Sequence, residues 1–213
     1  PQTVNAYYNP GMNEIVFPAA ILQPPFFDVE ADDAVNYGGI GGVIGHEIGH
    51  GFDDQGSRYD GHGNLQDWWT ADDRERFDAL AKKLIEQFNE LEPRNAPGHK
   101  INGALTVGEN IGDLGGLTIG YKAYQIATEG ADGIDKPDID GFTGDQRFFM
   151  GWAQVWKGKA REQEAIRLLA IDPHSPTEQR AHVLRNLHEF HEAFDVKEGD
   201  GLWLPEDERV RIF

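Results

Sequence analysis

Cysteine is absent from this chain of 213 residues, and basic residues are scarce. Without cysteine no disulfide can form, and the redox compartment stays undetermined. The chain has 19 lysine and arginine residues against 37 acidic ones, which gives a formal net charge of −18. Such a surface repels phosphate backbones and anionic lipid, so we expect no nucleic-acid partner and no binding to membrane surfaces.

Long hydrophobic runs are also missing, and no segment reaches the ~20 apolar residues of a membrane span. No signal-peptide pattern is visible. The chain begins at Pro1 without an initiator methionine, so we expect it to be a piece of a longer protein. Its length and its 39% hydrophobic content are typical of a soluble globular domain with one sizeable core.

Local patterns predict a mostly helical α+β protein with a little sheet near the amino end. The β-prone residues 4–8 and 14–17 flank a turn signal at residues 9–11 and predict a hairpin. The glycine- and aspartate-rich residues 130–144 predict an exposed, mobile loop. Apolar spacing and capping signals, including a capping box at residues 175–178, predict helices at residues 31–52, 70–91, from 106 onward, 145–159 and 175–194.

The segment His46-Glu47-Ile48-Gly49-His50 predicts a zinc site with its own general base. Two histidines four residues apart lie on one helix face, about 6 Å apart along the axis, so both imidazoles can reach one cation. Glu47 projects beside that cation, where it can take a proton from a zinc-bound water. Because so short a pattern also arises by chance, this interpretation needs a third ligand.

Glu109 and Asp113 offer that ligand and its support, because they lie four residues apart on one face of a predicted helix. Glu109 would complete a two-histidine, one-glutamate site with a fourth position open for water, as in catalytic zinc sites. Asp113 would accept the ring N–H of a liganding histidine. Taken alone, the two acids are more simply explained as a solvated helix face. Asp53 could support His50 or cap its own loop.

Six segments form an ordered set of motifs, namely residues 4–8 (VNAYY), 15–27, 36–41 (NYGGIG), 46–54 (HEIGHGFDD), 108–113 (GENIGD) and 172–180. With these motifs the chain resembles the neprilysin and endothelin-converting-enzyme family of zinc metallopeptidases, in particular its bacterial oligopeptidase members. The resemblance covers nearly the whole chain and is weakest at residues 130–140 and after residue 195. One such motif could be accidental, but the ordered set could hardly be.

The resemblance implies a thermolysin-like (gluzincin) catalytic domain with one zinc ion per chain, bound by His46, His50 and Glu109. It implies that Glu47 polarises the attacking water and later passes its proton to the leaving amine. It also implies that Asp113 orients His46. The expected activity is hydrolysis of short peptides on the amino side of hydrophobic residues.

The resemblance also implies substrate contacts. His174 resembles the histidine that donates to the tetrahedral oxyanion, and Arg180 resembles the arginine that binds a substrate carbonyl. Asn5 and Ala6 resemble the edge strand on which the substrate backbone is laid. From spacing alone these residues would have ordinary helix-flanking or strand-end roles. The family's apolar pocket for the side chain after the scissile bond matches four residues that would otherwise be read as core: Ile21, Phe26, Val43 and Trp156.

Three departures from the family pattern modify these expectations. Gly42 stands where neprilysin has a bulkier residue, which predicts a deeper pocket that tolerates large aromatic side chains. Lys157 and Asp195 show that the cysteines of the animal ectoenzymes are absent, which indicates a bacterial protein, cytoplasmic or exported. The family's large amino-terminal helical region is absent from this chain, and we expect that missing region to pack over the site.

We therefore expect residues 1–213 to form the catalytic domain of a zinc metalloendopeptidase. A competing hypothesis is a zinc-stabilised module that binds peptides without cleaving them. Glu47 argues against it, because zinc retention does not require that carboxylate. A metal-free helical interaction domain would leave the clustered histidine and acidic residues unexplained.

Overall fold

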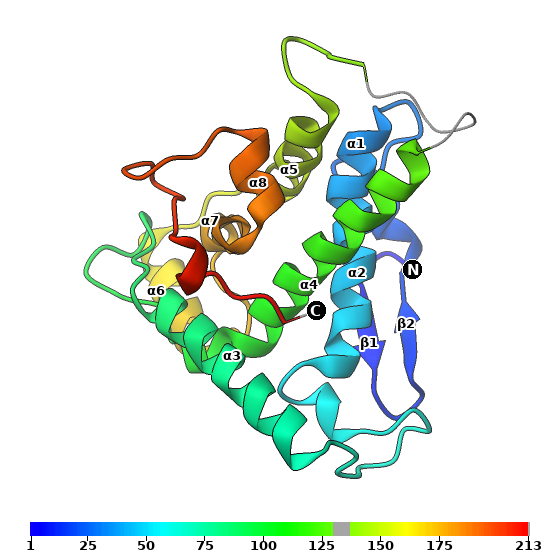
Figure 1. The fold of residues 1–213 in the computed structure, drawn as a ribbon, viewed down its shortest axis with the longest axis vertical. Coiled ribbons are helices and arrows are strands. Elements are labelled where there is room, and N and C mark those ends of the chain that lie inside the picture. Colours follow the sequence, from blue (N-terminus) through cyan, green and yellow to red (C-terminus); the bar gives the residue numbers. More distant parts are fainter. Residues whose placement is uncertain (130–136, 213) are drawn as a thin grey trace.

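The computed structural model describes residues 1–129 and 137–212, and these are mostly helical (Figure 1). The expected α+β class with little sheet is confirmed. The two strands are β1 (Tyr7–Asn9) and β2 (Glu14–Val16). The α-helices in the described residues are α1 (Asp33–Asn36), α2 (Gly42–Gly49), α3 (Ala71–Asn89), α4 (Gly103–Thr128), α5 (Gly144–Val155), α6 (Glu162–Ile171), α7 (Thr177–Arg180) and α8 (His188–Ala193).

The predicted amino-terminal hairpin is confirmed, although its strands are shorter than expected. β1 and β2 pair antiparallel, with Tyr7 opposite Val16 and Asn9 opposite Glu14. Residues 10–13 form the turn. Asn5 and Ala6 therefore precede β1, and the expectation that they lie within the edge strand is corrected.

The predicted helix over residues 31–52 is present but not uniform. It consists of α1, a π-helical turn at Tyr37–Gly41, α2, and a 3-10 turn at His50–Phe52. Within the π turn, the backbone N–H of Ile40 donates to the Phe26 carbonyl at 2.8 Å instead of continuing the helical ladder. A local insertion of this kind changes the direction of the helix without ending it.

α2 and α4 cross near the centre of the molecule and approach each other through glycine (Figure 1). A Cβ atom at Gly45 would lie 2.7 Å from the Gly116 carbonyl oxygen, and one at Gly116 would lie 2.5 Å from the Gly42 carbonyl oxygen. Side chains at these positions would push the helices apart, so glycine permits a backbone-to-backbone crossing. The crossing brings the zinc motif on α2 next to Glu109 on α4.

Capping explains where three of the helices begin. The Thr70 hydroxyl accepts from the Asp73 N–H at the start of α3, as predicted. α4 begins at Gly103, three residues before the expected start, because Asn102 accepts from the Leu105 N–H. α5 has a capping box formed by residues 143 and 146, and it ends at Val155, before the expected residue 159.

The single long helix expected over residues 175–194 is wrong. The structure has the four-residue α7, a 3-10 segment at Ala181–Asn186, and α8. Ser175 does not cap a helix, because its hydroxyl donates to Asn110 Oδ1 at 2.7 Å. α6 was not predicted. Of the loop expected at residues 130–144, residues 130–136 lie outside the described part of the chain.

The hydrophobic core includes the aromatic face of α5. Phe148, Phe149 and Trp152 are buried, and the Phe149 ring packs edge-to-face against Phe190 of α8, with centroids 5.6 Å apart. The Phe148 ring stacks on Tyr124 of α4 at 6.0 Å. Large aromatic contacts of this kind join the carboxy-terminal helices to the α2–α4 crossing.

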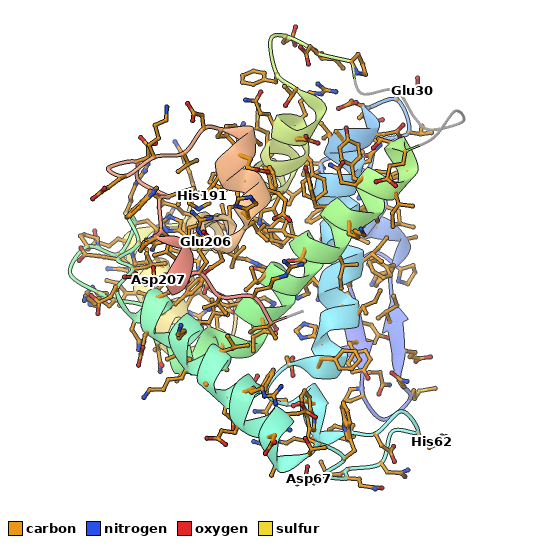
Figure 2. The ribbon with its side chains drawn as sticks, viewed as in Figure 1. Glu30, His62, Asp67, His191, Glu206 and Asp207 are labelled. Atoms are coloured by element: carbon orange, nitrogen blue, oxygen red, sulfur yellow. The ribbon has the colours of Figure 1, made fainter. Side chains whose placement is uncertain are left out.

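Many of the acidic residues lie at the periphery. Figure 2 shows Glu30 and Asp67 at the rim of the ribbon, together with His62, and all three side chains are exposed. None of the helices in residues 1–129 and 137–212 is long and apolar enough to cross a membrane.

Candidate active site

A cleft of about 460 Å³ lies where the amino-terminal segment, α2, α4 and the start of α7 meet. Asp113 is the one predicted site residue that does not line it, because that side chain is fully buried. The cleft brings together the other predicted site residues: Asn5, Ala6, Ile21, Phe26, Val43, His46, Glu47, His50, Glu109, Trp156, His174 and Arg180.

Three potential metal ligands converge in this cleft. Donor atoms of His46, His50 and Glu109 all lie within 4.8 Å of one another. His46 lies on α2, His50 begins the 3-10 turn that follows it, and Glu109 comes from α4 across the glycine crossing. Over residues 1–129 and 137–212, this is the one group of three or more histidine and acidic side chains that could hold a metal ion.

The contacts of the two imidazoles fit a cation between them and Glu109. His46 Nδ1 lies 2.8 Å from Asp113 Oδ1, so a neutral ring bonded to that carboxylate presents its Nε2 lone pair to Glu109 Oε2 at 3.1 Å. His50 Nε2 lies 3.6 Å from the same oxygen. Glu109 Oε2 is buried and forms no aligned hydrogen bond. Two nitrogen lone pairs and a carboxylate oxygen facing one another require a positive charge among them.

The pKa values of His46 and Glu109 in the metal-free site also indicate a place for a positive charge. Burial by itself lowers the pKa of His46, but its contacts with Asp113 and Glu109 outweigh burial and raise the pKa to about 9. Burial raises the pKa of Glu109, but the neighbouring His46 and the other histidines bring it down to about 2. The site therefore holds a proton on His46 when no metal is present. These residues fit a zinc ion in donor type, number and charge.

Each of the two histidines is oriented by its own carboxylate. Asp113 contacts His46 as described, and Asp53 Oδ2 lies 2.7 Å from His50 Nδ1. The other oxygen of Asp53 accepts the backbone N–H groups of Gln55 and Gly56, at 2.8 and 2.6 Å. Both alternatives for Asp53, support of His50 and capping of its loop, therefore hold together. Such carboxylate partners fix the tautomer and direction of a liganding imidazole.

Arg180 forms a buried ion pair with Asp113. Its Nε donates to Asp113 Oδ2 at 2.8 Å and its Nη2 to Oδ1 at 2.5 Å, with both side chains buried. Burial would raise the pKa of Asp113, but Arg180 and then His46 lower it. The guanidinium also lies 3.7 Å from the centroid of the Trp156 ring. Arg180 is thus part of the support of His46 as well as of the cleft wall.

Glu47 lies next to the ligand cluster without joining it. Its side chain is buried, and Oε2 has no hydrogen-bond partner. Burial raises the pKa of this carboxyl, although the nearby histidines partly oppose the rise. A buried carboxylate with a raised pKa and an unused oxygen is a suitable proton acceptor.

His174 lies beside Glu109, in the segment before α7. Its Nε2 is 3.2 Å from Glu109 Oε2, and its Nδ1 is 2.9 Å from Asp172 Oδ1. The sequence reasoning did not single out Asp172. A local signal was available, because an aspartate two residues before His174 is typical of an Asx turn, and the His174 N–H donates to Asp172 Oδ1 at 2.9 Å.

The four predicted apolar pocket residues all line the cleft. Ile21 and Val43 are buried, and Phe26 packs edge-to-face on Trp156 with centroids 6.1 Å apart. Ala6 is buried at the rim, next to the exposed Asn5. The structure therefore brings the predicted pocket and the predicted backbone-binding residues into the same cleft as the ligands.

The expectation for Gly42 assumed that position 42 faces the pocket, and this is wrong. A Cβ atom at this position would lie 3.0 Å from Trp152 and 3.8 Å from Leu117, both of which are core residues. Gly42 does not line the cleft. A side chain here would alter the core and not the pocket, so the inferred deeper pocket has no basis.

Sequence comparison connects this geometry with known proteins. Residues 5–210 match peptidase family M13. Neprilysin-1 of Caenorhabditis elegans is 47% identical over 199 residues, which cover 92% of this chain and 26% of that protein. The neutral endopeptidase of Lactococcus lactis subsp. lactis (strain IL1403) is 43% identical over 211 residues, 99% of this chain and 31% of that protein. The chain spans about a quarter to a third of the length of these relatives.

Solved structures show the same similarity. The zinc metalloprotease Zmp1 of Mycobacterium tuberculosis, in complex with an inhibitor, has a TM-score of 0.93 at 62% identity, with 98% of this chain and 32% of that chain covered. PepO from Lactobacillus rhamnosis HN001 has a TM-score of 0.86 at 38% identity, with 98% and 31% covered. The arrangement of helices described above is therefore that of these peptidase structures.

Proposed function

Because the chain belongs to peptidase family M13, we propose that it provides the catalytic site of a zinc-dependent endopeptidase. The proposed reaction is hydrolysis of short peptides on the amino side of hydrophobic residues. The observation that carries this proposal is the convergence of His46, His50 and Glu109 within 4.8 Å, beside the buried carboxylate of Glu47. A zinc site that only stabilises a fold needs no such carboxylate.

We assign the metal to His46, His50 and Glu109 and the general base to Glu47. These three ligands would hold a zinc ion, which would supply Lewis acidity toward a water molecule and the substrate carbonyl. Glu47 takes a proton from the attacking water and passes it to the leaving amine. The raised pKa of Glu47 supports this role, because it brings the carboxylate closer in basicity to the groups with which it exchanges the proton.

Asp113 and Asp53 keep the imidazoles ready to bind metal. Each accepts a hydrogen bond from the Nδ1–H of its histidine, so that Nε2 of His46 and of His50 keeps its lone pair. Arg180 holds Asp113 as a carboxylate through two hydrogen bonds. This chain of contacts supports the proposed ligand set.

His174 is proposed to donate from Nε2 to the carbonyl oxygen of the scissile bond as negative charge develops on it. Asp172 Oδ1 lies 2.9 Å from Nδ1 and helps to orient the ring. Arg180 is proposed to bind a substrate carbonyl through Nη1, since its bonds to Asp113 use Nε and Nη2.

Specificity is proposed to come from the apolar wall of the cleft. Ile21, Phe26, Val43 and Trp156 would receive the side chain that follows the scissile bond. The backbone around Asn5 and Ala6 would hold the peptide in extended form by strand addition. One methylene in such a pocket changes selectivity by about 1–3 kcal/mol, so we expect a graded preference.

We also propose a partner within a longer polypeptide. The relatives are about three to four times the length of this chain, so they have a region with no counterpart here. In a polypeptide of that length, the additional region would pack over the cleft and restrict access to short peptides.

The test is digestion of a mixed peptide library by the zinc-loaded protein, with and without a chelator, read by mass spectrometry. We expect chelator-sensitive cuts before hydrophobic residues. Glu47→Gln is the matched control, because it should keep zinc and lose cleavage. Peptide binding without cleavage by the zinc-loaded parent would instead support the non-cleaving module.

A further inference from the structure

The segment that carries His174 lies between two short helices. α6, which precedes it, buries one residue, Ala165. α7, which follows it, is a single turn of four residues, of which Gln179 and Arg180 are buried. His174 and Ser175 lie outside both helices, so a contact from this segment to α4 would help to fix the position of His174.

A buried chain of hydrogen bonds supplies that contact. The Ser175 hydroxyl donates to Asn110 Oδ1 at 2.7 Å, and Asn110 Nδ2 donates to Thr106 Oγ1 at 3.0 Å. The Thr106 hydroxyl then donates to the Asn102 carbonyl at 3.4 Å. Ser175, Asn110 and Thr106 are all buried, and Asn110 is 0% exposed. The chain ends on the backbone of the residue that caps α4, so it is anchored to that helix.

The two ends of the central hydrogen bond are adjacent in sequence to site residues. Ser175 follows His174, and Asn110 follows Glu109. Across the site, His174 Nε2 lies 3.2 Å from Glu109 Oε2. One buried hydrogen bond therefore joins the residue beside the proposed oxyanion donor to the residue beside the proposed metal ligand. Loss of this bond would free His174 to move relative to Glu109 while Glu109 stayed fixed on its helix.

We propose that Asn110 and Ser175 are positioning residues that hold His174 in register with the metal ligands. This inference rests on the proposed endopeptidase function. The hydrogen bond acts through His174, which acts mainly in the transition state, so its loss should affect turnover more than substrate binding.

The first test compares Ser175→Ala with Ser175→Thr, which keeps a hydroxyl. We expect Ser175→Ala to lower kcat about 10–100-fold, with KM changed less than about threefold and zinc content unchanged. Ser175→Thr should recover most of the loss. Thr118→Ala is the matched control, because it removes a hydroxyl from α4, the helix that carries Asn110. The Thr118 hydroxyl donates to the Leu114 carbonyl at 2.8 Å. Parent-like kcat in Ser175→Ala would overturn the inference.

A double-mutant cycle separates positioning from general support of the fold. If Ser175 acts through His174, Ser175→Ala should lower kcat in the parent but cause no further loss in a His174→Ala background. An equal fold-loss in both backgrounds would show that Ser175 acts independently of His174, which contradicts the proposal.

A third measurement needs no activity. In the parent protein we expect a nuclear Overhauser effect between the ring of His174 and the side chain of Glu109, and we expect Ser175→Ala to weaken it while Thr118→Ala does not. If the parent cleaves no peptide, the proposed function fails and this measurement alone decides the positioning role. An unchanged effect in Ser175→Ala would refute it.

Discussion

Substitution of Asp113 should change two quantities that can be measured separately, the unfolding free energy and the affinity for zinc. Asp113 is 0% exposed and contacts two functional side chains, His46 and Arg180. Asp113→Ala leaves the guanidinium of Arg180 buried without its counter-charge and leaves the imidazole of His46 without its orienting acceptor. The two losses are measured separately.

The expected magnitudes follow from these contacts. Breaking a buried ion pair by removing one partner lowers the unfolding free energy by about 3–5 kcal/mol. Loss of the carboxylate behind a liganding histidine weakens metal binding by about 10–100-fold. Asp113→Asn keeps an oxygen that can accept from His46, so we expect it to lose less zinc affinity than Asp113→Ala.

The assay combines urea unfolding of the zinc-free protein with zinc affinity from competition with a chromophoric chelator. Asp32→Ala is the matched control, because Asp32 accepts from Arg147 Nε at 2.7 Å and Nη2 at 3.2 Å, away from the site. We expect this control to lower stability and leave zinc affinity unchanged. If folded Asp113→Ala binds zinc as tightly as the parent and Asp32→Ala do, the orienting role is refuted.

Three further predictions concern turnover, pH and the helix crossing. His174→Ala should keep zinc and fold but lower kcat about 10²–10³-fold in steady-state kinetics, and parent-like turnover would exclude it from the mechanism. The pKa of His46 in the folded protein is raised from 6.5 to about 9. Protein stripped of zinc by a chelator should therefore lose unfolding free energy as the pH rises from 6.5 to about 9, measured by urea titration, because the stabilising proton on His46 is lost over that range. Zinc-loaded protein should not show this loss. Gly45→Ala should lower unfolding free energy by about 1–3 kcal/mol, since its Cβ would lie 2.7 Å from the Gly116 carbonyl oxygen. Gly61→Ala, with open space around it, should not.

Spacing and resemblance were sufficient to predict which side chains meet at the proposed metal site. His46 and His50 repeat at a helical interval, and the motif at residues 108–113 indicated Glu109 as the third candidate ligand. The structure brings all three together. Their convergence could be predicted because the spacing of the two histidines is local and the resemblance supplied the third residue; their role as ligands stays a prediction.

The sequence could not reveal contacts that join distant segments. Arg180 was expected to bind a substrate carbonyl, which stays a prediction, but its bonds to Asp113, which span 67 positions in the chain, were not foreseen. The apparent capping box at Ser175 failed for the same reason, because its hydroxyl bonds to Asn110 across 65 positions. Local patterns record which groups can form a hydrogen bond, but tertiary contacts decide which partner each group takes.

The expectation that position 42 faces the pocket was wrong, because resemblance gives the place of a residue in the sequence but not the direction of its side chain. The residue lies one position from Val43, which does line the cleft, yet its missing Cβ points toward Trp152. Successive residues of a helix differ by about 100° in direction, so neighbours of a pocket residue commonly face the core.

Zinc content tests the central claim most directly. After zinc loading and dialysis, native mass spectrometry should find one zinc ion on each parent chain and on each Glu47→Gln chain. Glu109→Ala should bind zinc more weakly and lose it first on dilution, because it lacks one of the three ligands. Equal loss of zinc from Glu47→Gln and Glu109→Ala, or full retention by both, would contradict the assignment of one carboxylate as ligand and the other as base.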